Sequence, residues 1–212
     1  MLKWITAFTQ EIENCAIKAG FMYRFASRYY KNIIESEAIL ANVTEKDHIL
    51  CVGGGVCPFS AILFHQLTGA KVTVIDNNMD CIPKAKQIIS RLGLEEQIFV
   101  YCQDGRCAEI PFSEYTVVHL ALQVSPMESV FAQIESRLAP GTRLMIRRPK
   151  KQLCNAYCRL FSNLLSCCAY TTHHARNVGS TLLYIKQGYS NERQLDCVGT
   201  HNHIVDGRLI AV

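Results

Sequence analysis

The sequence predicts an α/β protein built on a doubly wound sheet of seven strands, mostly parallel with the last strand antiparallel. Five short apolar runs alternate with helical segments between residues 48 and 166, and three glycines follow the first run. Repeated strand–helix units build a parallel sheet through right-handed crossovers. Two further β runs, near residues 170 and 184, have no helix between them and are therefore expected to pair antiparallel.

An N-terminal helical segment is expected over residues 1–46. Residues 2–19 place apolar side chains at helical spacing, and Gly20 ends that run. A second helix is expected over about residues 22 to 42. Its apolar stripe consists of Tyr30, Ile33, Ile34, Ala38 and Ala41.

Glu37 lies in the middle of this apolar stripe. A carboxylate that faces the core is costly unless another group pairs with it or a reaction uses it. Such groups have perturbed pKa values, which suit acid–base chemistry. Glu37 is therefore a candidate catalytic residue, and a structural ion pair with an arginine or lysine is the alternative.

A glycine-rich turn follows the first predicted strand, Ile49–Val52. Gly53, Gly54 and Gly55 lead into a helix that begins near Ala61. Glycines at a strand-to-helix turn let the backbone bend tightly and approach a ligand, and the helix N-terminus adds free N–H groups. Pro58 occupies the third position of the GxGxxG pattern, so a merely tight connection also fits this segment.

Two acidic residues follow the next two strands. The strand Lys71–Ile75 ends at Asp76 and Asn77, about 20 residues past the glycines, where a carboxylate meets ribose hydroxyls in nucleotide-binding sheets. The strand Ile98–Tyr101 is followed by Asp104 and Gly105. Each acid alone also fits a helix cap or turn. Together with the glycines, they indicate a nucleoside-containing cofactor.

The remaining elements complete the sheet. A helix is expected over Asp80–Leu92, a strand over Tyr115–Leu122, and a helix opened by Ser125 and Pro126. They are followed by a strand at 144–146, a helix at 151–166 and β runs at 168–173 and 181–186. Residues 188–212 form a C-terminal extension with a hairpin signal around Asp206 and Gly207. The central domain is therefore 47–187.

Composition excludes several classes of protein. The net charge of +4 is mild and forms no basic stripe, so no nucleic-acid partner is expected. No apolar segment is long enough to span a bilayer, and the start is not a signal peptide, so a cytoplasmic location is expected. The one basic cluster, at 147–151, is interpreted as a solvated loop, with an anionic-substrate role as the alternative.

A metal site is not expected. Cys154 and Cys158 are one helical turn apart, with His173, His174, His201 and His203 nearby in composition, but no paired CxxC spacing occurs. An apolar helix face explains the two cysteines better. His119, on the fourth strand, is interpreted as a core histidine rather than a base.

Several motifs carry a resemblance to a known family. They are the glycine segment 52–60 with Pro58 and Ser60, and the segments 29–32, 36–38, 121–122, 143–147 and 179–183. Together they resemble class I S-adenosylmethionine (SAM)-dependent methyltransferases, and within them most of all nicotianamine synthase and its archaeal and bacterial relatives. The resemblance runs from about Tyr29 to Gln187 and implies a Rossmann-like SAM-binding domain, with Pro58 and Leu122 in the cofactor site.

The resemblance also implies a reaction. That family transfers the 3-amino-3-carboxypropyl group of SAM rather than its methyl group, and a glutamate corresponding to Glu37 is catalytic. Glu37 would remove a proton from the attacking amine, with Tyr30 lining the same pocket. The expected partner is a small amine or amino acid.

Two other functions stay open at this point. An ordinary small-molecule methyltransferase has the same fold and needs little more than in-line positioning. A non-catalytic SAM-binding scaffold is the third reading. The sequence does not name the acceptor, and it leaves a homodimer open.

Overall fold

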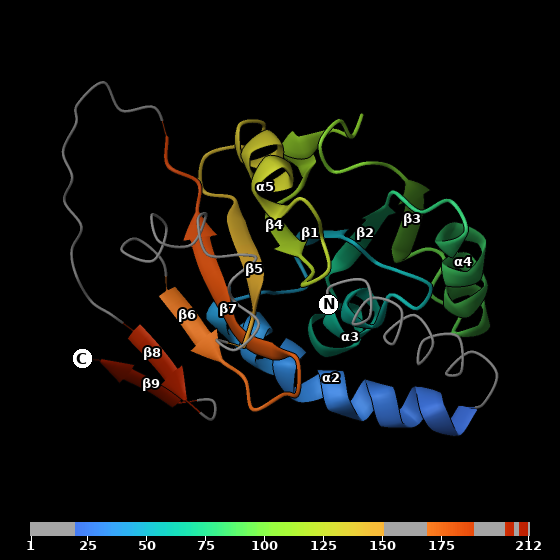
Figure 1. Cartoon of the computed structure of the whole chain (residues 1–212), viewed down its shortest axis with the longest axis horizontal. Helices are drawn as coiled ribbons and strands as arrows, with labels where there is room; N and C mark the ends of the chain where they lie inside the picture. The colour runs from blue at the N-terminus through green and yellow to red at the C-terminus, as the bar shows by residue number, and fades with distance from the viewer. Residues whose placement is uncertain (1–19, 151–168, 189–201, 206–207, 212) are drawn as a thin grey trace.

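One mixed sheet runs through the computed structural model, with helices on both of its faces (Figure 1). The structure describes residues 20–150, 169–188, 202–205 and 208–211. The strand order is β3-β2-β1-β4-β5-β7-β6-β8-β9. The strands are β1 His48–Val52, β2 Lys71–Asp76, β3 Ile98–Cys102, β4 Val117–Leu120, β5 Arg143–Pro149, β6 Ala169–Thr172, β7 Val178–Ile185, β8 Asn202–Val205 and β9 Arg208–Ala211.

The first seven strands confirm the predicted fold class. Strands β1 to β5 pair in parallel, whereas β7 lies antiparallel between β5 and β6. The predicted hairpin is also present, because β8 and β9 pair antiparallel. It extends the sheet beyond β6, with which β8 pairs in parallel, so the sheet has two strands more than the seven predicted. The helices predicted at 2–19 and 151–166 lie outside the described residues.

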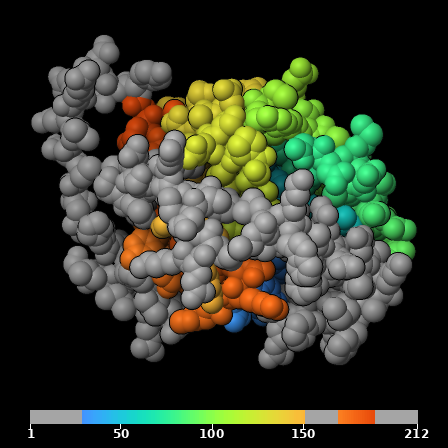
Figure 2. All heavy atoms as spheres, viewed as in Figure 1, coloured from blue at the N-terminus to red at the C-terminus, as the bar shows by residue number. Residues whose placement is uncertain are grey.

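Helices cover the sheet from two sides. Helices α2 Gly20–Leu40, α3 Phe59–Thr68 and α4 Cys81–Arg91 contribute to one apolar cluster, and α5 Met127–Glu135 belongs to a second cluster on the other face. Figure 1 shows α2 and α3 side by side below the sheet and α5 above it. A short 3-10 helix, Phe112–Glu114, also belongs to the α5 side. Figure 2 shows the green and yellow segments adjoining along the upper part of this view.

Buried strand residues divide between the two faces by alternation, as the pleat requires. On β4, Val117 faces the cluster with α2 and α3, whereas Val118 and Leu120 face the cluster with α5. The strand ends at Leu120, two residues before its predicted end, because the chain turns there: the N–H of Val124 donates to the carbonyl of Ala121. Residues 121–124 are therefore a loop at the carboxyl edge of the sheet.

A polar network fixes the end of α2 against the start of β5. The Arg143 guanidinium donates to the carbonyls of Ala41 (2.6 Å) and Asn42 (2.8 Å) and pairs with the carboxylate of Asp47. Thr116 also donates to Asp47, at 2.7 Å. The C-terminal end of α2 is thus held at the amino end of β5, and the preceding turns of the helix extend toward the carboxyl ends of the strands.

In the part of the chain that the structure describes, none of the helices has the length and apolarity needed to cross a bilayer.

Candidate active site

Two adjoining pockets lie at the carboxyl ends of the central strands. The first, called the cofactor pocket, includes Gly53, Gly55, Asp76, Asn77, Asp104 and Gly105. The second, called the inner pocket, includes Tyr30, Gly54, Pro58, His119, Leu122 and Arg147. Val52, Gly53 and Gln123 line both pockets. Six of the nine residues predicted to bind a cofactor therefore line the cofactor pocket, whereas Gly54, Pro58 and Leu122 line the inner pocket together with candidate Tyr30.

Asp76 is held in a defined orientation at the end of β2. Its Oδ2 accepts a hydrogen bond from the N–H of Gly55 at 2.7 Å, and its Oδ1 accepts one from the N–H of Asn78 at 2.9 Å. Each carboxylate oxygen has a further lone pair, and the residue lines the cofactor pocket. This arrangement can accept hydrogen bonds from two neighbouring hydroxyls of a ligand.

The glycines keep the backbone close to this pocket. Gly53 and Gly55 have φ angles of +83° and +62°, a left-handed conformation that favours glycine. A Cβ at Gly54 would lie 2.2 Å from Cγ1 of Val74, and one at Gly105 would lie 2.9 Å from Cγ1 of Val130. These positions leave no room for a side chain, so the chain forms a cradle of backbone atoms at the pocket.

Asp104 makes the turn contact that was the alternative prediction, and a cofactor-binding role stays a prediction. Its Oδ1 accepts the N–H of Arg106 at 2.8 Å, which is a turn contact, and its Oδ2 lies 2.6 Å from Nη2 of the same arginine. These hydrogen bonds from Arg106 lower the pKa of Asp104 below its ordinary value. Asp104 also lines the cofactor pocket, where it presents a negative charge.

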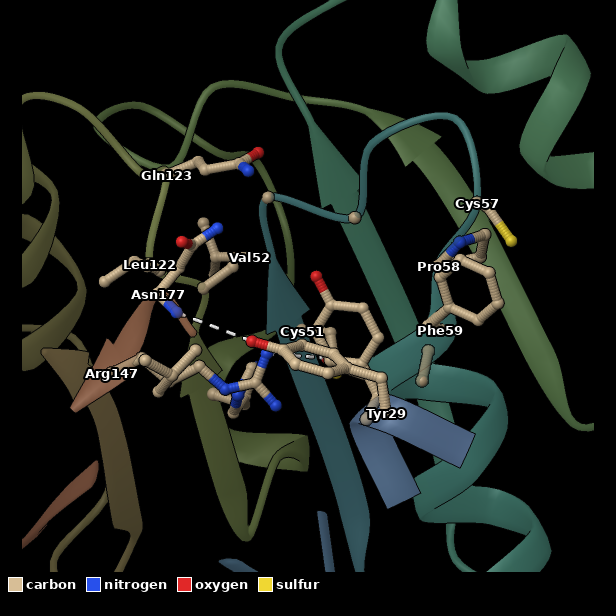
Figure 3. A pocket seen from close by; sticks show the side chains of 18 residues that line it. Tyr29, Cys51, Val52, Cys57, Pro58, Phe59, Leu122, Gln123, Arg147 and Asn177 are labelled. Atoms are coloured by element: carbon tan, nitrogen blue, oxygen red, sulfur yellow. Dashed lines mark hydrogen bonds between the residues drawn. The ribbon is translucent and has the colours of Figure 1, made fainter. Parts of the chain in front are cut away.

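The inner pocket lies between the glycine turn and the loop after β4 (Figure 3). In Figure 3, Leu122 and Gln123 lie on one side of this space, Pro58 and Phe59 on the other, and Arg147 and Tyr29 below. The Tyr29 hydroxyl accepts the N–H of Arg176 at 2.8 Å. The Tyr30 ring stacks on Phe59, with ring centroids 5.6 Å apart.

A buried ionic network adjoins the inner pocket, and Glu37 is its centre. The Arg147 Nε and Nη2 donate to Oε1 and Oε2 of Glu37, each at 2.7 Å, and the Thr181 hydroxyl donates to Oε1 at 2.6 Å. The Glu37 side chain has no exposed surface. Glu37 therefore forms the structural ion pair that was the alternative prediction, with Arg147 as its partner. A catalytic role for Glu37 stays a prediction.

The ion pair with Arg147 keeps the Glu37 carboxylate ionised. Burial by itself raises the pKa of Glu37, but the Arg147 guanidinium and the His119 ring together outweigh burial and hold the pKa far below its ordinary value. Glu37 is therefore ionised at neutral pH. Cys51 also lines the inner pocket, but burial raises the pKa of its thiol to about 12, so it is not a thiolate nucleophile.

Arg147 corrects the prediction of a solvated loop at 147–151. The residue lies in β5, only 3% exposed, and its Nη1 donates to the Ser60 hydroxyl at 3.0 Å. Its position explains the difference: Arg147 is two residues after buried Met145, so it faces the same side of the sheet as α2. The alternation of β5 could have indicated which face of the sheet this arginine occupies, but not that it lies beside Glu37.

His119 is buried, as predicted, but it also lines the inner pocket. Its Nε2 lies 3.6 Å from Oε2 of Glu37. His173, one of the histidines considered above for a metal site, is hydrogen-bonded to the Thr181 hydroxyl at 2.8 Å. Among the described residues, no three His, Cys, Asp or Glu side chains are grouped to hold a metal ion, whereas Cys154, Cys158 and His201 lie outside those residues.

Comparison with known proteins confirms the fold. No protein-family model matches the chain. The chain is similar to a glutamate-to-glutamine variant of MtNAS, a nicotianamine synthase, with a TM-score of 0.70 and 20% identity over 84% of this chain and 70% of that one. It is also similar to an RNA methyltransferase from Salinibacter ruber, solved with S-adenosylhomocysteine, with a TM-score of 0.56 and 19% identity over 78% and 96% of the two chains. The chain therefore has the Rossmann-like methyltransferase fold.

Two further matches are to proteins whose ligands or reaction are known. MtNAS has also been solved in complex with MTA and tNA, and this structure matches with a TM-score of 0.69 at 20% identity over 84% of this chain and 70% of that one. In sequence, the chain is 24% identical over 118 residues to L-histidine 2-aminobutanoyltransferase of Yersinia pestis. That match covers 56% of this chain and 43% of the relative, so the chain spans less than half of the relative's length.

Proposed function

We propose that this protein is a SAM-dependent transferase that transfers the 3-amino-3-carboxypropyl group of SAM to a small amine or amino acid. The observation that carries the proposal is the pair of adjoining pockets. One has the features of a nucleoside site, and the other is lined by Arg147, whose guanidinium is paired with the buried carboxylate of Glu37. The likenesses to MtNAS and to the histidine aminobutanoyltransferase support it.

The residues of the cofactor pocket fit SAM. The Asp76 carboxylate, oriented by two backbone N–H groups, suits the ribose hydroxyls, and the glycines leave room for the ligand beside the backbone. Gly53 and Gln123 line both pockets and would therefore border the reacting end of the cofactor. Bound SAM would supply an electrophilic carbon next to a sulfonium.

We propose that the inner pocket holds the acceptor. Arg147 lines this pocket and keeps its positive charge, because Glu37 is paired with it in a fixed bidentate geometry. Tyr30 lines the same pocket, and its ring lies 5.9 Å from the Arg147 guanidinium carbon. We propose that Tyr30 bounds the acceptor and that Glu37 holds Arg147 in place.

Methyl transfer to a small molecule is the alternative on the same fold, since it needs only positioning. The two reactions leave different nucleosides, methylthioadenosine and S-adenosylhomocysteine. Incubating the protein with SAM and each of a panel of amino acids, including L-histidine, and identifying the nucleoside by mass therefore tests the proposal. Methylthioadenosine formed only with an acceptor supports it, and S-adenosylhomocysteine supports methyl transfer. Tight SAM binding without either product supports a scaffold.

The same proposal includes the cellular location and the partners of the protein. A small polar acceptor and a nucleoside co-substrate are both found in the cytoplasm, and we expect the protein there. No nucleic-acid partner is proposed, because the net charge of +4 is too mild for a phosphate-binding stripe.

A further inference from the structure

We propose that His119 is the catalytic residue that accepts the proton from the acceptor amine. This inference rests on the proposed function, because it concerns the nucleophile of that transfer. It assigns the proton to a histidine of the sheet instead of to the glutamate of α2. Glu37 then acts as a positioning residue, through Arg147 and His119.

The position of His119 brings it to the floor of the inner pocket. It lies on β4 between Cys51 of β1 and Met145 of β5, whose side chains point to the same face of the sheet. The Phe64 ring of α3 packs against its imidazole, with ring centroids 5.4 Å apart. The residue is 1% exposed, yet it is one of the residues that line the pocket.

Both ring nitrogens of His119 lack a hydrogen-bond partner among the residues that the structure describes. The carboxylate of Glu37 lies 3.6 Å from Nε2, slightly too far for a hydrogen bond. A buried polar group without a partner is costly, so an unsatisfied imidazole at a pocket wall indicates a ligand that completes it. An amine bound in the inner pocket would be such a ligand.

Glu37 is poorly suited to accept the proton itself. Three donors already occupy its two oxygens, and it is not among the residues that line the pocket. Burial raises its pKa, but Arg147 and His119 together hold the pKa far below the ordinary value, which makes Glu37 a weak base. The Glu37 oxygen nearest to His119 can instead attract the Nε2 proton, which leaves the lone pair on Nδ1.

The surroundings keep His119 neutral. Burial lowers the pKa of its imidazole, Arg147 lowers it further, and Glu37 opposes both effects. The other titratable groups close to this cluster are His173, whose pKa burial also lowers, and Cys51, whose thiol stays protonated. A neutral imidazole has one lone pair available at neutral pH, as a base requires.

The proposed step balances as follows. His119 takes one proton from the acceptor ammonium, R–NH3⁺, and becomes an imidazolium, which leaves the lone pair of R–NH2. The nitrogen forms a bond to the carbon next to the sulfonium, the carbon–sulfur bond breaks, and its electron pair goes to sulfur. The product is a secondary ammonium, R–NH2⁺–R′, which takes over the positive charge of the sulfonium and keeps both nitrogen-bound protons, and His119 later releases its proton to solvent. A nearby sulfonium lowers the pKa of the ammonium, which assists the first transfer.

Replacing His119 by asparagine, H119N, tests the inference, with H173N as the matched control. His173 is a second buried histidine, 4.0 Å from the other Glu37 oxygen, but it does not line the pocket. We expect H119N to bind SAM normally by calorimetry and to lose about 100- to 10,000-fold in kcat at neutral pH. The acid limb of the wild-type pH profile should shift in H119N to the pKa of the acceptor amine and stay unchanged in H173N.

The dependence on the acceptor separates proton transfer from a structural role. An acceptor whose amine has a low pKa needs no base, so the difference between wild type and H119N should narrow with such acceptors. A folded H119N that binds SAM and keeps both the wild-type rate and the acid limb would overturn the inference, while methylthioadenosine formation by the wild type would still support the proposed function. No methylthioadenosine from the wild type would overturn both.

A measurement on the wild type covers the case in which H119N does not fold. Nitrogen-15 NMR of the histidine rings reports the charge and tautomer of His119 without turnover. A neutral ring at pH 7, whose unprotonated nitrogen shifts when an amine acceptor is added to the protein with methylthioadenosine, supports the inference. An imidazolium at pH 7, or a ring that does not respond to the acceptor, overturns it.

Discussion

Glutamine is neutral, so replacing Glu37 by glutamine removes the countercharge of the Arg147 guanidinium. Both side chains are buried, so water does not replace the lost charge. Removing one partner of a buried ion pair costs about 3–5 kcal/mol, so we expect the free energy of unfolding to fall by about that amount. Urea unfolding followed by circular dichroism measures it. Glu35→Gln, on the same helix, removes an exposed pair with Lys31 and should change little. Equal effects of the two substitutions would contradict the assignment.

The difference in unfolding free energy between the wild type and Glu37→Gln should depend on pH in one direction. Burial raises the pKa of Glu37, but Arg147 and His119 together outweigh burial, so the pKa in the folded protein lies below its ordinary value of 4.5. The stability that the carboxylate contributes is therefore fully present above about pH 4.5 and is lost as the pH falls toward the folded pKa. The wild type and Glu37→Gln should differ by a constant amount above pH 5.5 and converge in acid. A difference that grows below pH 4.5 would contradict this prediction.

Asp76 should matter for SAM affinity more than for folding. Its carboxylate lines the cofactor pocket and is oriented by the N–H groups of Gly55 and Asn78. Hydrogen bonds to a charged group contribute about 1.5–3 kcal/mol, so Asp76→Asn should weaken SAM binding about 10- to 100-fold by calorimetry. Asp80→Asn is the matched control, since Asp80 precedes α4 and does not line the pocket. An unchanged affinity of Asp76→Asn for SAM would contradict the proposal that the Asp76 carboxylate binds the ribose hydroxyls.

The sequence could place Asp76 but not the partner of Glu37, and the reason is distance along the chain. Asp76 follows from local spacing, since a strand and a glycine turn about 20 residues earlier define its position. Glu37 was recognisable as a carboxylate on an apolar stripe. Its partners lie 110 and 144 residues away, at Arg147 and Thr181, and only the pairing of β5 with β7 brings them opposite each other.

The turn between β1 and α3 depends on the absence of a side chain at Gly54. A Cβ there would lie 2.2 Å from Cγ1 of Val74, so Gly54→Ala should destabilise the protein and weaken SAM binding. Overpacking of this kind costs about 1–3 kcal/mol. Val74→Ala removes the colliding methyl groups, and the penalty of Gly54→Ala should be smaller in that background. A double-mutant cycle by urea unfolding measures this coupling, for which we expect about 1–3 kcal/mol.

Gly141→Ala is the control for that cycle. Gly141 has a φ of +84° and nothing within 4 Å of an added Cβ, so alanine there tests backbone strain alone, worth about 1–2 kcal/mol. Its effect should be independent of Val74. If Gly54→Ala is equally costly with and without Val74→Ala, steric collision with Val74 is not the reason for the glycine.

Strands and helices of the central domain could be predicted because their signals are local. The apolar runs, Gly69 and Gly93 give boundaries that agree with α3 and α4 to within a few residues. The end of β4 was placed two residues late because Ala121 and Leu122 are apolar, although they belong to a loop. Likewise, the hairpin was visible in its turn residues, but its addition to β6 depends on a long-range pairing.

At the scale of the molecule, the sheet is a support that brings distant segments to one edge. The helix α2, the glycine turn, the loop after β4 and the end of β5 all contribute side chains to the inner pocket, and β2 and β3 bring Asp76 and Asp104 to the cofactor pocket. Because the pockets exist only when these strands are paired, a ligand that fills them binds the folded chain and not the unfolded one. Binding and global stability are therefore linked.

This linkage predicts that SAM raises the melting temperature of the whole protein. At a free concentration 100 times Kd, binding stabilises the folded state by about 2.7 kcal/mol. For a chain of this length, about 1 kcal/mol shifts Tm by about 2–4 °C, so we expect an increase of about 5–10 °C in a thermal scan. The increase should grow with the logarithm of the SAM concentration and should be smaller for Asp76→Asn at the same concentrations. A Tm that does not respond to millimolar SAM, in a protein that unfolds cooperatively, would refute SAM as the co-substrate. An equal shift in Asp76→Asn would place the nucleoside outside the cofactor pocket.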